Sequence, residues 1–137
     1  RLLVSPRPVD GESFGRLARR AVFCLVPDGH WPATQRLPAV IAKGCVPVVV
    51  SNRVELPFSD LIDWGQASVR LHEGRIHDLP VALREVEAER ILVMQQNLQF
   101  LAQALDYHHP RLHMLLLASL SIRRTSVKDH RGGPRNA

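Results

Sequence analysis

The ten residues from Pro27 to Arg36, PDGHWPATQR, form the segment of the sequence best suited to chemistry. They separate an apolar run from an amphipathic stretch, so they are predicted to lead from a strand into a helix. Gly29 allows a ligand to approach the backbone closely, and Thr34 is a suitable N-cap for the helix. The first N–H groups of that helix and the five-donor guanidinium of Arg36 both suit phosphate oxygens. Together these features describe an anion site. The alternative is a solvated Arg36 at an ordinary helix start, and the residues by themselves favour this alternative.

A second candidate segment, residues 51–58, reads SNRVELPF and follows another apolar run. Leu56 and Phe58 are expected to pack into the core. Glu55 lies between apolar neighbours, where its carboxylate can accept hydrogen bonds from sugar hydroxyls. The alternative is that Glu55 pairs with Arg53 or caps a helix N-terminus, and the residues by themselves favour this alternative.

The apolar runs at 22–26 and 46–50 are predicted to be strands, and the segment between them contains a helix over 34–43. Strands joined in this way run parallel, with helices on the faces of the sheet. The run at 22–26 is apolar on both faces, which favours a buried strand over an edge strand. A weakly alternating segment at 67–71 predicts a third strand at an edge. The fold class is therefore α/β: a Rossmann-like partial parallel sheet with flanking helices, followed by C-terminal helices.

Apolar residues at helical spacing predict the helices and their inward faces. The helices are expected at 12–20 with Phe14, Leu17 and Ala18 inward, at 34–43 with Leu37, Val40 and Ile41 inward and Gly44 as its stop, after Asp78 as an N-cap, at 87–105 with Ile91, Met94, Leu98, Leu101 and Leu105 inward, and at 112–122. Phe100 is expected in the core. The last helices present strong apolar faces, so poor solubility is expected of the chain.

The composition is that of one globular domain, with 137 residues, 45% hydrophobic and 23% charged. A net charge of +5 suggests nucleic acid, but from Ser121 onward there are five basic residues against Asp129 alone, and the remainder is nearly neutral. Aromatic residues that could stack on bases are scarce. We therefore predict a domain at 1–122, a basic disordered tail at 123–137 and no nucleic-acid partner. No stretch approaches the ~20 apolar residues of a membrane span.

The cysteines and histidines give no metal-site pattern. Cys24 and Cys45 lack the spacing of a zinc site, and free buried thiols are expected, with a disulfide as the alternative. His108, His109 and His113 surround Pro110 and are predicted to form a polar turn. No metal and no cofactor is therefore predicted.

Four ordered blocks resemble the exostosin-like glycosyltransferases, glycosyltransferase family 47. They are FCLVPDGH at 23–30, TQRL at 34–37, IAKGCVPVVVSN at 41–52 and VELPF at 54–58, and LIDW at 61–64, SV at 68–69 and Glu73 continue the pattern. The similarity spans roughly residues 14–107. Several spaced blocks in the right order are far more specific than one short motif.

The resemblance implies the C-terminal, donor-binding half of a GT-B glycosyltransferase. Such enzymes transfer a sugar from a nucleotide diphosphate, here expected to be a UDP-sugar, to a glycan or glycoprotein acceptor with inversion and without a DxD-bound metal. They are Golgi type II membrane proteins with lumenal domains, so a membrane segment outside this chain is implied. The donor would contact Gly29, Thr34, Gln35, Arg36 and Glu55, with Arg36 on the diphosphate, where it would stabilise the charge of the leaving group.

Three departures from the family pattern lead to an alternative. The chain has about half the length of a complete family domain, so it is expected to be a fragment that lacks the N-terminal lobe, and no catalytic base can be named. Pro38 and Ala39 stand where an aromatic and an acidic residue are usual, and the acidic residue typically holds the nucleotide ribose. Asn52 replaces a common Asp. The alternative is therefore a catalytically silent relative that acts as a partner subunit or binding module.

Overall fold

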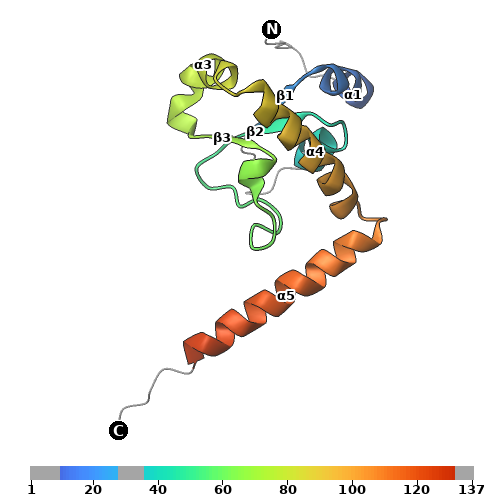
Figure 1. Ribbon diagram of the computed structural model, residues 1–137, viewed down its shortest axis with the longest axis vertical. Helices are drawn as coiled ribbons and strands as arrows, with labels where there is room; N and C mark the ends of the chain where they lie inside the picture. The colour runs from blue at the N-terminus through green and yellow to red at the C-terminus, as the bar shows by residue number, and fades with distance from the viewer. Residues whose placement is uncertain (1–9, 28–35, 132–137) are drawn as a thin grey trace.

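A computed structural model describes residues 10–27 and 36–131, with side chains to Arg124. Its centre is a three-stranded sheet in the order β1-β2-β3 (Figure 1). The strands are β1 (Phe23–Pro27), β2 (Val46–Val50) and β3 (Val69–Leu71). Both strand pairs are parallel, with Pro27 opposite Val50 and Val50 opposite Leu71. The predicted parallel α/β sheet is thus confirmed, and β3 lies at an edge as expected.

Helices precede, connect and follow the strands. They are α1 (Gly11–Arg20), α2 (Arg36–Ile41), the 3-10 helices η1 (Trp64–Gln66) and η2 (Glu73–Asp78), α3 (Leu79–Arg84), α4 (Ala88–Ala104) and α5 (Pro110–Arg131). The predicted stop of α2 is confirmed, because Gly44 has φ +69°, a left-handed conformation that glycine adopts without strain. No helix of the described residues combines the length and the apolarity needed to cross a bilayer.

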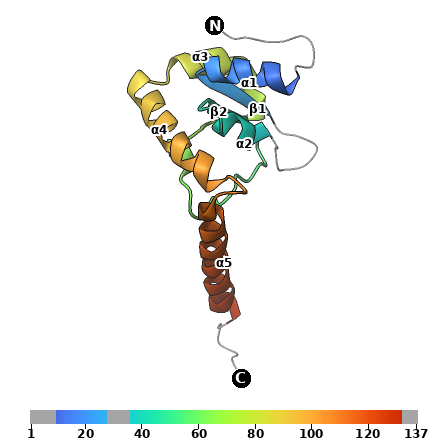
Figure 2. The ribbon, with the colours of Figure 1, turned by 90° about the vertical axis from the view of Figure 1, so that its right-hand side faces the viewer.

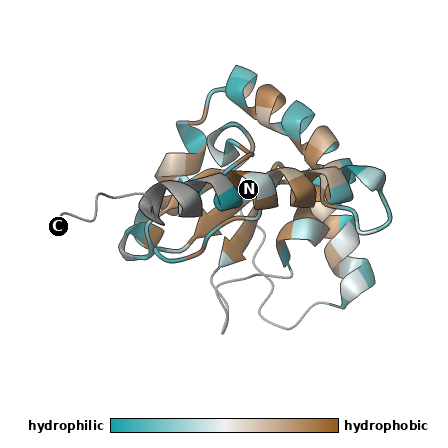
Figure 3. Ribbon diagram, turned by 90° about the horizontal axis from the view of Figure 1, so that it is seen from below, coloured by the Kyte–Doolittle hydropathy of each residue, from teal (hydrophilic) through white to brown (hydrophobic). Residues whose placement is uncertain are grey.

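The two faces of the sheet are covered by different helices. On one face, α2 and α4 pack against β1 and β2 in the main core cluster, which includes Val26, Val40, Val49, Met94 and Leu98. On the other face, Leu79 of α3 joins Val48, Val50 and Leu71 in a smaller cluster. Figure 2 shows the sheet between α3 and the pair α2 and α4. In Figure 3 the strands are brown and the helices alternate between brown and teal, as expected for amphipathic helices around an apolar sheet.

The prediction that β1 is a buried strand and not an edge strand is wrong, because β1 forms an edge of the described sheet and Val26 is the one buried residue among its five. Leu25 stands opposite Val48 and so faces the side of α3. The six-residue α3 packs over β2 and β3, and Leu25 remains 38% exposed. Val26, on the opposite face, is buried under α2 and α4.

Two further side chains differ from the expected core. Leu17 of α1 was expected to face inward but is 40% exposed, and Ala18 and Gly15 are the buried residues of that helix. Phe100 was expected in the core but is 53% exposed, because it lies off the stripe of Met94, Leu98 and Leu101 that faces the sheet. The guanidinium carbon of Arg111 lies 5.0 Å from the Phe100 ring centroid, a cation–π contact between α4 and α5.

The expectation of free thiols is also wrong, since Cys24 and Cys45 form a disulfide with a Cα–Cα distance of 5.8 Å. Cys24 stands opposite Pro47, and Cys45 precedes Pro47 by two residues. A shift of two residues along a strand returns a side chain to the same face, so the two Cβ atoms are diagonal neighbours. This Cα separation lies within the usual disulfide range.

The last helix differs most from its prediction. It was expected at 112–122, and instead α5 covers Pro110–Arg131 and takes in the first residues of the segment expected to be a disordered tail. It extends away from the sheet in Figures 1 and 2. The expected uncovered apolar face is confirmed within the described residues, because Met114, Leu117 and Leu120 are each more than 60% exposed.

This apolar face leads to an expected association of the chain. Contiguous exposed apolar surface favours contacts between molecules, so light scattering at high concentration should give a mass above that of the monomer. Leu117→Glu should lower this mass, whereas Gln103→Glu, at an exposed position of α4, adds the same charge without removing apolar surface. A clean monomer of the unmodified chain at high concentration would contradict the prediction.

Candidate functional site

The segment after β2 begins with a tight turn that Ser51 holds. The Ser51 side-chain oxygen accepts hydrogen bonds from the backbone N–H groups of Arg53 at 3.1 Å and Val54 at 3.0 Å. Val54 and Leu56 are both buried at 4% exposure, so the predicted core position of Leu56 is confirmed. The chain therefore leaves the carboxyl edge of the sheet in a defined direction, with Glu55 between two buried anchors.

A reciprocal pair of hydrogen bonds joins the segments after β2 and β3. The backbone N–H of Asn52 donates to Glu73 Oε1 at 3.0 Å, and the backbone N–H of Glu73 donates to Asn52 Oδ1 at 3.1 Å. The two residues follow strands that pair in parallel, so their backbones lie at the same edge of the sheet. We call this pair the Asn52–Glu73 clasp.

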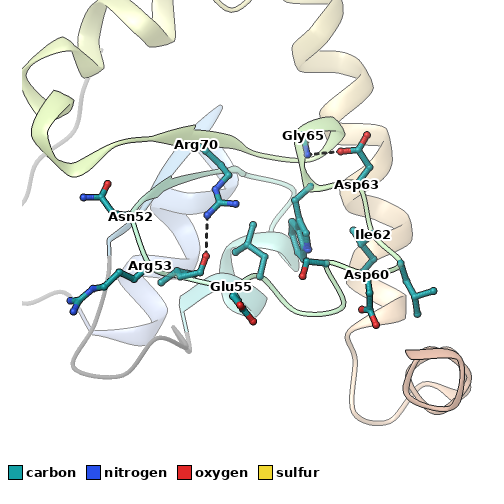
Figure 4. A pocket seen from close by; sticks show the side chains of 13 residues that line it. Asn52, Arg53, Glu55, Asp60, Ile62, Asp63, Gly65 and Arg70 are labelled. Carbon is teal, nitrogen blue, oxygen red and sulfur yellow. Dashed lines mark hydrogen bonds between the residues drawn. The ribbon is translucent and has the colours of Figure 1, made fainter. Parts of the chain in front are cut away.

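A third attachment comes from the side chain of Arg70 on β3. Its Nη2 donates to the carbonyl oxygen of Val54 at 3.0 Å, across the surface on which Glu55 lies (Figure 4). The side chains of Ser51, Glu73 and Arg70 thus satisfy three N–H groups and one carbonyl of the segment 52–54. A short irregular segment with this many fixed backbone groups holds its side chains in defined positions.

The far end of the same loop is held by Trp64. Its indole N–H donates to the carbonyl oxygen of Pro57 at 2.9 Å, and the ring is buried in the main core cluster. Asp63 Oδ1 accepts from the backbone N–H of Gly65 at 2.9 Å and so caps η1. Phe58, expected to pack into the core, is half-buried and has φ +53°, an unusual conformation for a bulky residue.

Residues 52–56, 59–65 and 70 line an open depression of about 840 Å³. Its lining comes from the loop after β2, from η1 and from β3, as Figure 4 shows. The charged residues in the lining are Arg53, Glu55, Asp60, Asp63 and Arg70. A surface with both carboxylates and guanidinium groups suits a polar ligand that offers hydroxyl donors and anionic oxygens.

Asp60 connects this depression to α5. Its Oδ2 accepts a hydrogen bond from the Ser119 hydroxyl at 2.6 Å and lies 3.6 Å from Nε of Arg123. The Ser119 hydrogen bond, with a smaller contribution from Arg123, lowers the pKa of Asp60 below its ordinary value. A lowered folded-state pKa means that this attachment stabilises the fold above the unfolded pKa and is lost as the pH falls through the folded value. No sequence signal indicated this contact, which joins residues 59 positions apart.

The predicted site residues lie in different places in the structure. Glu55 is exposed and lines the depression. Arg36 begins α2 and is exposed, but it is not among the residues that line the depression. Gly29, Thr34 and Gln35 lie outside the described residues. Within residues 10–27 and 36–131 no three His, Cys, Asp or Glu side chains form a group that could hold a metal ion.

Comparison with known proteins identifies the family. The family model of the Exostosin GT47 domain matches residues 5–86. This match covers more than half of the chain and includes the whole three-stranded sheet. The chain belongs to the exostosin GT47 family. The sequence resemblance to these glycosyltransferases is therefore confirmed.

Individual curated relatives match most of the chain. A probable glycosyltransferase of Arabidopsis thaliana is 30% identical over 131 residues, which is 93% of the chain and 28% of the relative. Exostosin-1a of Danio rerio is 33% identical over 88% of the chain, and exostosin-1 of Bos taurus is 32% identical over 85%. These matches cover 16% and 15% of the two exostosins, so the chain spans less than a third of the curated relatives.

Proposed function

We propose that the chain is the donor-binding lobe of an inverting glycosyltransferase that transfers a sugar from a nucleotide diphosphate, of which UDP is the expected one, to a glycan acceptor. The observation that carries this proposal is the family match over a β1–α2–β2 unit with parallel, in-register strands. In open α/β sheets ligands bind beyond the carboxyl ends of the strands. By family likeness, the whole protein would act on the lumenal side of the Golgi membrane, with an acceptor lobe outside this chain.

Arg36 and Glu55 would bind different parts of the donor. Arg36 at the start of α2 follows the segment that leaves β1, and Glu55 follows the segment that leaves β2. Pro27 and Val50, where these two strands end, stand opposite each other at one edge of the sheet. A guanidinium would bind the diphosphate bidentately and stabilise the charge that grows on the leaving nucleotide, while the carboxylate would accept hydrogen bonds from sugar hydroxyls.

Calorimetric titration of the 137-residue chain with UDP and with GDP tests this proposal. We expect saturable binding of UDP, and Arg36→Ala should weaken it by about tenfold or more because charge-assisted hydrogen bonds to the diphosphate are lost. Arg90→Ala removes an equally charged, exposed side chain from α4 and serves as the matched control. Absence of saturable binding to the unmodified chain and to the Arg36→Ala variant alike would overturn the donor-lobe assignment.

A catalytically silent relative that serves as a partner subunit is the second candidate, and Ala39 is the observation that favours it. Ala39 is exposed in α2 and offers only a methyl group where the family pattern has an acidic residue for the nucleotide ribose. Pro38 gives less support, because it is the third residue of α2 and its carbonyl still accepts from Ala42 N–H at 2.9 Å. The complete protein would then associate with an active transferase and show no turnover with any sugar nucleotide.

A further inference from the structure

We infer that Asn52 and Glu73, the two residues of the clasp, are positioning residues that fix Glu55 for the sugar part of the donor. This inference rests on the proposed function and names the side chains that would prepare one part of its site. It begins with Glu55, the carboxylate that lines the depression from the middle of the loop after β2.

The loop would not hold Glu55 without help from the neighbouring strand. Residues 51–57 form no helix or strand, so their backbone groups have no ladder of hydrogen bonds to fix them. Glu73 and Arg70, from β3 and the residues after it, bind the loop at Asn52 and Val54, on the N-terminal side of Glu55. Leu56, buried in the core, anchors the position that follows. Glu55 is therefore held from both sides.

The clasp is well placed for a positioning role and poorly placed for a large structural one. Glu73 and Asn52 are both exposed, so water replaces their hydrogen bonds when the clasp is lost. Exposed hydrogen bonds contribute little to global stability. Their geometric effect is larger, because a small displacement of a binding group weakens its interaction with the ligand. The clasp is thus expected to affect ligand preference more than folding.

The expected effect on the preference for a UDP-sugar over UDP follows from the part of the ligand that Glu55 would contact. A carboxylate that accepts hydrogen bonds from sugar hydroxyls contributes to the binding of a UDP-sugar and not to the binding of UDP. Loss of positioning should therefore lower the affinity for the UDP-sugar selectively. A general loss of folded protein would lower the affinities for both ligands by the same factor, which makes the ratio of the two affinities the informative quantity.

The experiment measures this ratio by calorimetry on the 137-residue chain with UDP, UDP-glucose, UDP-glucuronic acid, UDP-xylose and UDP-N-acetylglucosamine. For the UDP-sugar that binds most tightly, Glu73→Ala should weaken binding about fivefold and leave UDP within about twofold. Glu73→Gln keeps an oxygen acceptor for the Asn52 N–H and should restore the affinity. Glu85→Ala, which removes an exposed carboxylate at the end of α3, is the matched control.

A double-mutant cycle connects the clasp to Glu55. In a Glu55→Ala background, Glu73→Ala should no longer change the preference for the UDP-sugar, because the group that it positions is absent. If UDP and the UDP-sugar bind the unmodified chain but Glu73→Ala changes both affinities equally or neither, the positioning role is overturned and the proposed function stands. If no ligand binds the unmodified chain, the proposed function fails and this inference fails with it.

Discussion

Replacement of both cysteines by alanine is expected to lower the free energy of unfolding by about 3 kcal/mol. The disulfide joins Cys24 and Cys45, which are 21 positions apart, and its loss allows the unfolded chain many more conformations. Alanine is preferred to serine because Cys45 is fully buried in the main core cluster, where a hydroxyl would need a hydrogen-bond partner. Urea denaturation monitored by circular dichroism measures the difference.

A reducing agent supplies the matched control for this prediction. Dithiothreitol should lower the urea midpoint of the unmodified chain and leave that of the Cys24→Ala, Cys45→Ala variant unchanged. The disulfide attaches β1, an edge strand, to the residue that precedes β2. Equal midpoints for the oxidised chain and the double variant would show that the bond does not contribute to stability, contrary to this expectation.

The elements that the sequence predicted well are those whose pattern depends on local residues. The run VPVVV correctly predicts β2. The spacing of Leu37, Val40 and Ile41 correctly predicts the buried face of α2. Gly44 marked the end of that helix because a positive φ is a local requirement. In each case the burial expected from the pattern agrees with the fold, since β2 has a neighbour on both sides and helices on both faces.

The features that the sequence did not predict depend on how the strands pair and in which register. The apolar run of β1 is compatible with a central strand, but in the described sheet β1 pairs only with β2. Cys24 and Cys45 approach each other because β1 and β2 pair in one particular register. Register is set by the packing of the whole sheet, so a pattern read along one strand does not contain it.

The candidate site shows the same division. The apolar neighbours of Glu55 predict that it contacts a ligand, and it does line the depression. The sequence indicates Glu73 only through the family pattern, and no sequence feature indicates Arg70. Their hydrogen bonds to residues 52 and 54 arise from the pairing of β2 with β3, which brings together segments 16 and 21 positions apart.

The packing also shows that the structural unit extends beyond the family match. The Exostosin GT47 domain ends at residue 86, yet Met94, Leu98 and Leu101 of α4 belong to the main core cluster. Their side chains cover the face of the sheet formed by Val26 and Val49. A fragment cut at residue 86 would expose this face, so stability and ligand-binding measurements require α4.

Trp64→Ala is expected to destabilise the fold more than any other change proposed for this chain, by about 4 kcal/mol. The indole is 5% exposed in the main core cluster, and its removal leaves a cavity that the neighbouring side chains fill only in part. It also leaves the carbonyl oxygen of Pro57 without the indole hydrogen bond at 2.9 Å. Urea denaturation monitored by circular dichroism measures the loss of stability. Tryptophan fluorescence is unsuitable, because the substitution removes one of the two indoles of the chain.

Trp64→Phe separates the two contributions to this loss. A phenyl ring keeps most of the buried apolar surface but has no N–H, so we expect this variant to lose about 1 kcal/mol. Because the hydrogen bond fixes Pro57 near the end of the loop, Trp64→Phe should also increase amide hydrogen exchange in residues 58–63 without a comparable increase in β2. Equal stabilities for the Ala and Phe variants would mean that the indole N–H, and not the filling of the core, accounts for the contribution of Trp64.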